Sequence, residues 1–237
     1  MSILQFYFLL LHLFTQGGAL RQGVIGGRES VPHSRPYMVF TLDLVTQESC
    51  DGFLVTKDFV MTAAHCSKRR VIAFLGMHNK NELRIGDAIL VEPFPHPKYN
   101  SSTFENDIML LKLQKPAELS NRVRTIALPL YENETFTHNC LVMGWGSQTA
   151  NRTSPSKVLR EANVTTGNCT LPHIICSEGF TGPGSGDSGG PLICGDVAQG
   201  IVSNRIKKTF AARYTRISHY LGWIYSVIKK PHRYTKG

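Results

Sequence analysis

Short apolar segments, separated by turn residues, recur along almost the whole chain. Segments of four to eight residues that are rich in β-branched and aromatic side chains are typical of strands, and their spacing here is typical of antiparallel sandwiches and barrels. With 237 residues, 42% of them hydrophobic, the chain can form one all-β unit or two small ones. We therefore expect an all-β fold. The predicted strands lie in YMVFTLDL, GFLVT, FVMTAA, VIAFLG, AILVE, IMLLKL, CLVMGW, GPLICG, GIVS and ARYTRI.

One helix is predicted, near the carboxyl end of the chain. Ser218 is a suitable N-cap for residues 219–230, whose apolar positions recur at helical spacing. This pattern favours a helix that packs onto the protein body over a membrane helix. Residues 113–123 are a predicted crossover between two β halves. The predicted apolar face of the helix consists of Leu221, Ile224, Tyr225 and Ile228.

The amino-terminal residues predict export. The run from Ile3 to Phe14 is apolar, but it is shorter than the roughly 20 residues that a membrane-spanning helix needs. Gly17 and Ala19 have the spacing of a signal-peptidase site. We therefore interpret residues 1–19 as a signal peptide and expect a secreted protein that does not span the membrane.

Cysteines and glycosylation motifs agree with this route. Six cysteines in an exported chain indicate three disulfides, although their number alone leaves fifteen pairings open. Five N-x-[ST] motifs are candidates for glycosylation. These are Asn100, Asn133, Asn151, Asn163 and Asn168.

The chain is basic, with a formal net charge of +9. Runs of basic residues at 68–70, 207–208 and 229–233 can bind sulfated glycosaminoglycan, acidic granule matrix or anionic membranes. The alternative is a solvated basic surface without a partner. We expect no nucleic-acid partner, because the chain is exported and has no nucleic-acid-binding motif.

Three residues supply the hydroxyl, the imidazole and the carboxylate that an activated serine nucleophile needs. A serine hydroxyl attacks well only when an imidazole can take its proton, and an acid must hold that imidazole in one tautomer. His65 in TAAHC, Asp107 in NDIMLLKL and Ser188 in GDSGGP supply these groups. Each alone is commonplace in a structural role; together they predict acyl transfer through Ser188.

The glycines around Ser188 leave backbone N–H groups available for a developing oxyanion, with Gly186 and Ser188 as the expected donors. Asp187 adds a carboxylate that needs a partner if it is buried. Cleavage before Val24, in VIGG, would create an α-ammonium group able to supply that partner.

A second interpretation of GDSGG is the nucleophile elbow of α/β-hydrolases, in which the histidine follows the serine. His219 and His232 do follow Ser188. That fold alternates strands with helices, and no helix-length pattern precedes Ser188, so we do not favour it.

Over residues 24–237 the chain resembles a chymotrypsin-fold serine protease and, more narrowly, the granule proteases of haematopoietic cells. The matching motifs are VIGG, PHSRPYM, TAAHC, NDIMLLKL, GWG, LREANV, GDSGGPL, GIVS and YTRIS. The subgroup stays open. Gly184 replaces a cysteine that granzymes, mast-cell chymases and cathepsin G also lack, whereas the short loop from Cys169 to Cys176 is like that of neutrophil elastase.

The resemblance implies two six-stranded antiparallel barrels with a carboxyl-terminal helix, the first barrel over about 24–122 and the second over about 123–237. His65 and Asp107 would come from the first barrel and Ser188 from the second, with the Ser203 hydroxyl near Asp107. The implied disulfides are Cys50–Cys66, Cys140–Cys194 and Cys169–Cys176.

The residue before the expected new terminus is Gly23, which a trypsin-like activator would not recognise. Signal cleavage after Ala19 would leave residues 20–23, which can be removed as two dipeptides. This resembles the short propeptides of granule proteases.

The resemblance places Gly182 at the floor of the primary specificity pocket, with Pro183 and Ala212 nearby. None of these is charged, so trypsin-like specificity is not expected. Ser203 belongs to the strand that would pair with the substrate backbone.

Two residues depart from the family pattern at this pocket, because Asn204 and Arg205 replace an aromatic residue and a glycine. Arg205 could select an acidic substrate side chain, obstruct the pocket mouth, or turn into solvent. Asp51, in place of the usual glycine, is a further departure near the leaving-group side.

We predict an active endopeptidase, secreted or stored in granules, that acts on proteins or peptides in immune defence. The alternative is a weakly active or inactive protease-fold protein that binds glycans or microbial surfaces. We expect a monomer that serine protease inhibitors recognise, and no metal or cofactor, because the cysteines adjacent to His65 are better used in disulfides.

Overall fold

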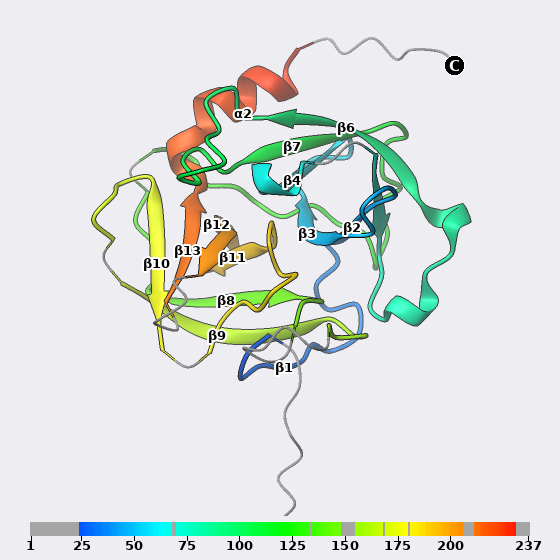
Figure 1. Cartoon of the computed structure of the whole chain (residues 1–237), viewed down its shortest axis with the longest axis horizontal. Coiled ribbons are helices and arrows are strands. Elements are labelled where there is room, and N and C mark those ends of the chain that lie inside the picture. Colours follow the sequence, from blue (N-terminus) through cyan, green and yellow to red (C-terminus); the bar gives the residue numbers. More distant parts are fainter. Residues whose placement is uncertain are drawn as a thin grey trace, which may run out of the picture.

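The computed structural model describes residues 24–67, 70–132, 134–147, 155–167, 169–179, 181–205 and 211–230. Two closed antiparallel barrels of six strands each make up the fold (Figure 1), which confirms the predicted all-β class. No helix within these described ranges is long and apolar enough to cross a membrane.

The first barrel has the strand order β2-β3-β4-β7-β6-β5 and closes between β5 and β2. Every strand pair in it is antiparallel, and buried apolar side chains such as Phe40 and Phe74 sit opposite each other on β2 and β5. Its strands are β2 (Met38–Asp43), β3 (Ser49–Leu54), β4 (Phe59–Thr62), β5 (Val71–Leu75), β6 (Ile89–Pro95) and β7 (Met109–Leu113).

The second barrel has the order β8-β9-β10-β13-β12-β11 and closes between β11 and β8. A two-residue strand, β1 (Arg28–Glu29), pairs with β9 outside this ring. In Figure 1 the second barrel occupies the lower left, below the first. Its strands are β8 (Asn139–Gly144), β9 (Arg160–Gly167), β10 (Ile174–Glu178), β11 (Pro191–Cys194), β12 (Val197–Arg205) and β13 (Ala212–Arg216).

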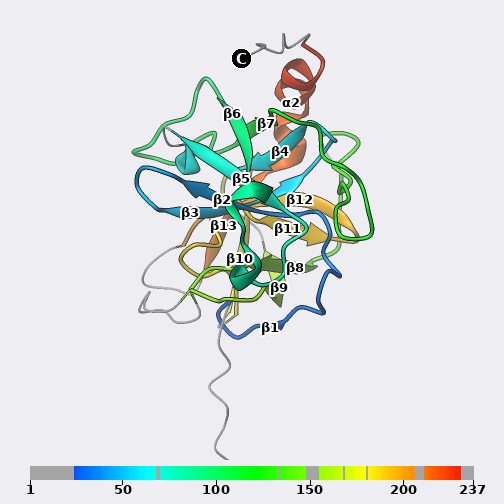
Figure 2. The ribbon, with the colours of Figure 1, turned by 90° about the vertical axis from the view of Figure 1, so that its right-hand side faces the viewer.

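Helix α2 (Leu221–Ile228) follows the second barrel but packs on the core of the first (Figures 1 and 2). A 3-10 turn, Ile217–Tyr220, leads into it, so the N-cap is Tyr220 and the predicted cap at Ser218 is wrong. The tight turn moves the helix start two residues along, and the Ser218 hydroxyl is buried instead. The buried face also differs from the prediction, because Val227 is buried whereas Tyr225 is 41% exposed.

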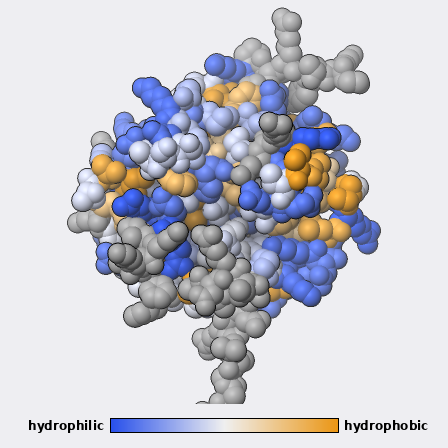
Figure 3. All heavy atoms as spheres, in the orientation of Figure 1, coloured by the Kyte–Doolittle hydropathy of each residue, from blue (hydrophilic) through white to orange (hydrophobic). Residues whose placement is uncertain are grey.

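Three disulfides are present, Cys50–Cys66, Cys140–Cys194 and Cys169–Cys176, and the described chain has no free cysteine. This pairing is the one that the resemblance implies. The first disulfide ties β3 to the turn that carries His65. On the face shown in Figure 3, apolar residues form small separate groups, as on ordinary protein surfaces.

Glu161 on β9 fastens the amino-terminal segment to the second barrel. Its buried carboxylate accepts hydrogen bonds from Arg28 at 2.9 Å, from Arg35 at 2.9 Å and from the Ser30 hydroxyl at 3.1 Å. Burial alone would raise the pKa of Glu161, but the bonds from Arg35, Arg28 and Ser30 lower it below its ordinary value. The carboxylate is therefore held in its charged form.

Glu161→Gln should lower the free energy of unfolding by about 1–3 kcal/mol at pH 7, because Arg35 loses a buried ionic partner. A lowered pKa stabilises the folded state above the ordinary pKa near 4, and this contribution disappears as the pH falls. Urea unfolding at pH 7 and pH 3 measures the difference, which should shrink at pH 3. The exposed substitution Glu82→Gln is the control; an equal loss in both variants would contradict the assignment.

Candidate active site

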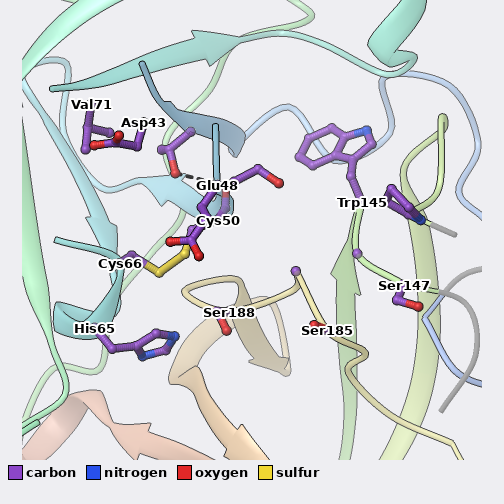
Figure 4. A pocket seen from close by; sticks show the side chains of 15 residues that line it. Asp43, Glu48, Cys50, His65, Cys66, Val71, Trp145, Ser147, Ser185 and Ser188 are labelled. Carbon is purple, nitrogen blue, oxygen red and sulfur yellow. Dashed lines mark hydrogen bonds between the residues drawn. A yellow bond between two sulfur atoms is a disulfide. The ribbon is translucent and has the colours of Figure 1, made fainter. Parts of the chain in front are cut away.

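The predicted triad residues meet where the two barrels join. His65 lies in the 3-10 turn Ala64–Cys66 after β4, Asp107 lies two residues before the start of β7, and Ser188 lies in the loop before β11. A pocket of about 470 Å³ opens beside them and is lined by His65, Ser188 and Gly186, among others. Figure 4 shows the His65 imidazole pointing toward the Ser188 hydroxyl across this pocket.

Asp107 is fully buried and fixes the imidazole from two directions. Its Oδ1 accepts a hydrogen bond from the His65 backbone N–H at 2.9 Å, and its Oδ2 lies 2.8 Å from His65 Nδ1. Oδ2 also accepts from the Ser203 hydroxyl at 2.5 Å, and the Thr215 hydroxyl donates to the Asp107 carbonyl at 2.9 Å. With Nδ1 held by the carboxylate, His65 Nε2 is left to face Ser188.

Phe104 also contacts the imidazole, a contact that the sequence analysis missed. Its ring lies 5.6 Å from the His65 ring, edge to face at 69°. Phe104 has φ of 60°, a left-handed conformation that is uncommon for an aromatic residue. Nothing in the pattern STFEND distinguishes this phenylalanine from a core residue.

The loop around Ser188 presents two backbone donors. No hydrogen bond among the described residues uses the N–H groups of Gly186 or Ser188. Gly186 has φ of 98°, which a residue with a β-carbon rarely adopts. A β-carbon at this position would also lie only 3.1 Å from the Cα atom of Gly146. The Ser188 carbonyl accepts from Asp51 N–H at 2.8 Å, which anchors the loop to β3.

Asp187, directly before Ser188, points into the protein and is fully buried. Its carboxylate accepts hydrogen bonds from Gly146 N–H at 2.7 Å and Gly184 N–H at 2.6 Å. Burial raises the pKa of Asp187 despite these bonds. In the uncut chain Val24 is buried in the core of the second barrel, and its nitrogen is an amide rather than an ammonium group.

Two further charged groups lie near Asp187. Asp51 on β3 is fully buried and accepts from Trp145 N–H at 3.1 Å. Lys80, which the sequence analysis did not single out, donates to the Trp145 carbonyl at 3.0 Å. Lys80 begins the 3-10 turn Lys80–Glu82, where the sequence HNKNE gives no periodic signal, and it approaches the site from a loop distant in sequence.

The residues expected at the primary pocket gather beside the second barrel. Gly182, Pro183 and Ala212 are buried, and Gly182 N–H donates to the Ile25 carbonyl at 3.1 Å. Arg205 at the end of β12 is half-buried. This burial weighs against the interpretation in which its side chain turns into solvent.

A second groove of about 220 Å³ lies next to Ser203. Asn204 and Arg213 line one side, and Phe104 and Leu171 contribute to the lining from neighbouring loops. The groove therefore lies between β12, the strand that carries Ser203, and the loop that carries Phe104.

Cys50, Cys66 and His65 place their ligand atoms within 4.8 Å of one another. Both sulfurs are joined in one disulfide, so neither is a thiolate able to bind a metal. This donor set does not fit a zinc site.

The family model for trypsin matches residues 24–224. The chain therefore belongs to the trypsin family of serine proteases, and it is a serine-type endopeptidase. Among its relatives, human granzyme H is 40% identical over 96% of this chain and 100% of the relative. Bovine duodenase-1 is 41% identical over 87% and 90%, and the chymase of Papio hamadryas is 40% identical over 93% and 96%.

Ser203→Ala should lower kcat by about 10-fold with little change in KM, because Asp107 loses a charge-assisted hydrogen bond that helps to hold the imidazole. Steady-state hydrolysis of a peptide substrate measures both constants. Ser30→Ala is the matched control, since that buried hydroxyl also donates to a carboxylate, on Glu161. Equal kcat in Ser203→Ala and the parent would contradict this role.

Proposed function

We propose that the protein is a secreted, granule-stored endopeptidase of non-tryptic specificity that acts in immune defence through an acyl-enzyme on Ser188. The observation that carries the catalytic assignment is the His65–Asp107 pair beside Ser188, together with two backbone N–H groups that donate no hydrogen bond to a described residue. The uncharged floor of Gly182, Pro183 and Ala212 supports non-tryptic specificity.

The proposed reaction has two halves. Ser188 Oγ attacks the scissile carbonyl while His65 Nε2 takes its proton, and the carbonyl electron pair becomes an oxyanion near the N–H groups of Gly186 and Ser188. The C–N bond then breaks, and His65 returns the proton to the leaving amine. Water repeats these steps on the acyl-enzyme and releases the acid and the free serine.

Activation is proposed to follow removal of the signal peptide, residues 1–19, and of the propeptide, residues 20–23. Both segments lie outside the described residues. The new Val24 ammonium group would then pair with buried Asp187, whose pKa burial raises despite the hydrogen bonds from Gly184 and Gly146.

Secretion is supported by three disulfides and by two exposed sequons, at Asn100 and Asn163. Asn133, Asn151 and Asn168 lie outside the described residues. Storage in granules and a role in defence are supported by the likeness to granzymes and chymases.

We further propose a monomer that binds serine protease inhibitors through the substrate groove and sulfated glycosaminoglycan through basic surface residues. Arg70, Lys229 and Lys230 are exposed, while the remaining basic runs fall outside the described ranges. A protein that acts only by binding is not favoured, because the buried Asp107 bonds orient His65 for proton transfer, which binding alone does not require.

A fluorophosphonate probe should label the processed protein at Ser188, and Ser188→Ala should abolish both labelling and peptide hydrolysis, because the reagent needs an activated serine hydroxyl. Ser185→Ala is the matched control, since this exposed serine lines the same pocket. Mass spectrometry identifies the labelled residue. Labelling that persists in Ser188→Ala, or its absence from protein that begins at Val24, would refute the assignment.

A further inference from the structure

Arg205 ends β12, and the pairing of β12 with β13 sets the face of the sheet from which its side chain projects. Arg205 pairs with Ala212 of β13, and Asn204 pairs with Arg213. Residues directly opposite each other in an antiparallel pair project to the same face, and neighbours along a strand alternate. Arg205 therefore shares a face with Ala212 and Tyr214. Asn204 and Arg213 project from the opposite face.

The exposure of Arg205 and Arg213 agrees with this assignment of their side chains to opposite faces of the sheet. Arg213 is exposed, Arg205 is half-buried, and Tyr214 is fully buried with its hydroxyl 3.0 Å from that of Ser177. Burial raises the pKa of Tyr214, while the bond with Ser177 and the positive charge of Arg205 oppose that shift. Burial lowers the pKa of Arg205 itself, against the influence of Tyr214 and Asp187. The guanidinium group therefore lies within electrostatic reach of Tyr214 and Asp187, on the face of the sheet that carries Ala212.

The other residues expected at this pocket, Gly182, Pro183 and Ala212, carry no charge. A lysine or arginine of a substrate would be repelled by the guanidinium group. An apolar side chain would remove water from this charged group, which is costly. A carboxylate would instead form charge-assisted bonds of matching geometry with it.

We propose, building on the protease function above, that Arg205 makes the pocket selective for substrates with Asp or Glu at P1, the residue on the amino side of the scissile bond. The guanidinium group binds the substrate carboxylate. Its aliphatic stem narrows the pocket against aromatic side chains.

The test uses processed enzyme and peptides that differ only at P1, with Asp, Glu, Asn, Gln, Leu, Phe and Lys. The acids should exceed their amide isosteres by about 10- to 100-fold in kcat/KM. Arg205→Gly should abolish this preference and improve cleavage after Leu and Phe, and Arg205→Glu should favour Lys. Arg84→Gly, at an exposed arginine in another loop, should leave the profile unchanged.

Two results would overturn this inference while leaving the protease function intact, provided that the fluorophosphonate still labels Ser188. An equal rise for every P1 residue in Arg205→Gly would mean that the side chain only obstructs the pocket. An unchanged profile would mean that Arg205 does not reach the substrate. Absence of labelling would instead contradict the protease function itself.

A separate observation concerns Asp51 and Asp187, whose carboxylates converge beside Gly144. A β-carbon added at Gly144 would clash with Asp51 Oδ2 and with Asp187 Oδ1. Asp51 Oδ2 accepts from Trp145 N–H, but its Oδ1 is buried and has no hydrogen-bond partner among the described residues. A fully buried acceptor therefore remains unused next to Asp187.

The uncut chain provides few positive charges for this pair. Lys80 lies near both carboxylates, with its ammonium group bonded to the Trp145 carbonyl. Arg205 acts on Asp187 from the side of the pocket. Burial, and then the negative charge of Asp187, raise the pKa of Asp51 well above its ordinary value despite Lys80. Two carboxylates thus share one nearby ammonium group.

We further propose that Asp51 is a second acceptor for the Val24 ammonium group, a positioning role that rests on the activation step above. Ile25 pairs with Gly182, five residues before Asp187, so the activation segment already lies against the loop that carries this carboxylate. Once Val24 is freed, two carboxylates face two ammonium groups, those of Val24 and Lys80.

Asp51→Asn should therefore have opposite effects on the two forms of the protein. In the uncut chain at pH 7 it should raise the urea midpoint, because it removes one of two buried charges that repel each other. A raised pKa means that the folded chain loses stability as the pH rises above the ordinary value near 4, so the gain should be small at pH 4. In protein processed to Val24 it should lower the midpoint.

Processed Asp51→Asn should also lose activity at a lower alkaline pH than the parent, by about one pH unit, because the ammonium group has one carboxylate fewer to hold its proton. Asp51→Gly should behave alike, and the exposed substitution Asp87→Asn should change neither property. N-terminal sequencing verifies each form. A change in urea midpoint of the same sign in uncut and processed protein, or an unmoved alkaline limit, would overturn the role of Asp51.

Discussion

The buried carboxylate of Asp107 joins the two barrels at the point where the chemistry occurs. From the first barrel, the backbone N–H and the ring Nδ1 of His65 bond to this carboxylate. From the second barrel, the Ser203 hydroxyl donates to the carboxylate and the Thr215 hydroxyl donates to the backbone carbonyl of Asp107. A buried charge is tolerated only when such bonds replace its hydration. The barrels must therefore dock in one relative position for Asp107 to remain charged, and that same position brings Ser188 to the imidazole.

The sequence predicted ten of the twelve barrel strands, all but β9 and β10, and the three central residues, because both signals are local. Short apolar runs between turn residues identify strands, and His65, Asp107 and Ser188 each lie in a short motif. Lys80 and Phe104 were not predicted, because each reaches the site from a loop whose own composition is unremarkable. Ser218 was assigned as a cap for the same local reason, but tertiary packing buries its hydroxyl and the 3-10 turn moves the helix start.

The loop over residues 182–190 combines three tasks that depend on one another. Gly182, the expected pocket floor, pairs with Ile25, while Gly186 and Ser188 carry the proposed oxyanion donors and Asp187 turns inward. Since Asp187 directly precedes Ser188, any partner that holds its carboxylate also fixes the orientation of the nucleophile. A change at the amino terminus can therefore reach the pocket through the backbone of a single short segment.

The two departures from the family pattern, Asp51 and Arg205, carry opposite charges, and both lie within electrostatic reach of Asp187. In the uncut chain, Lys80 and Arg205 are the positive groups that act on Asp187, and the latter does so from the pocket. A freed Val24 ammonium group would take over Asp187, with Asp51 as its second acceptor. Arg205 would keep its positive charge at the proposed entrance for the substrate side chain, near an Asp187 now paired with Val24. Under these proposals, the cleavage that orders the nucleophile also changes the electrostatic surroundings of the group proposed to select an acidic substrate, so one buried carboxylate couples specificity to activation.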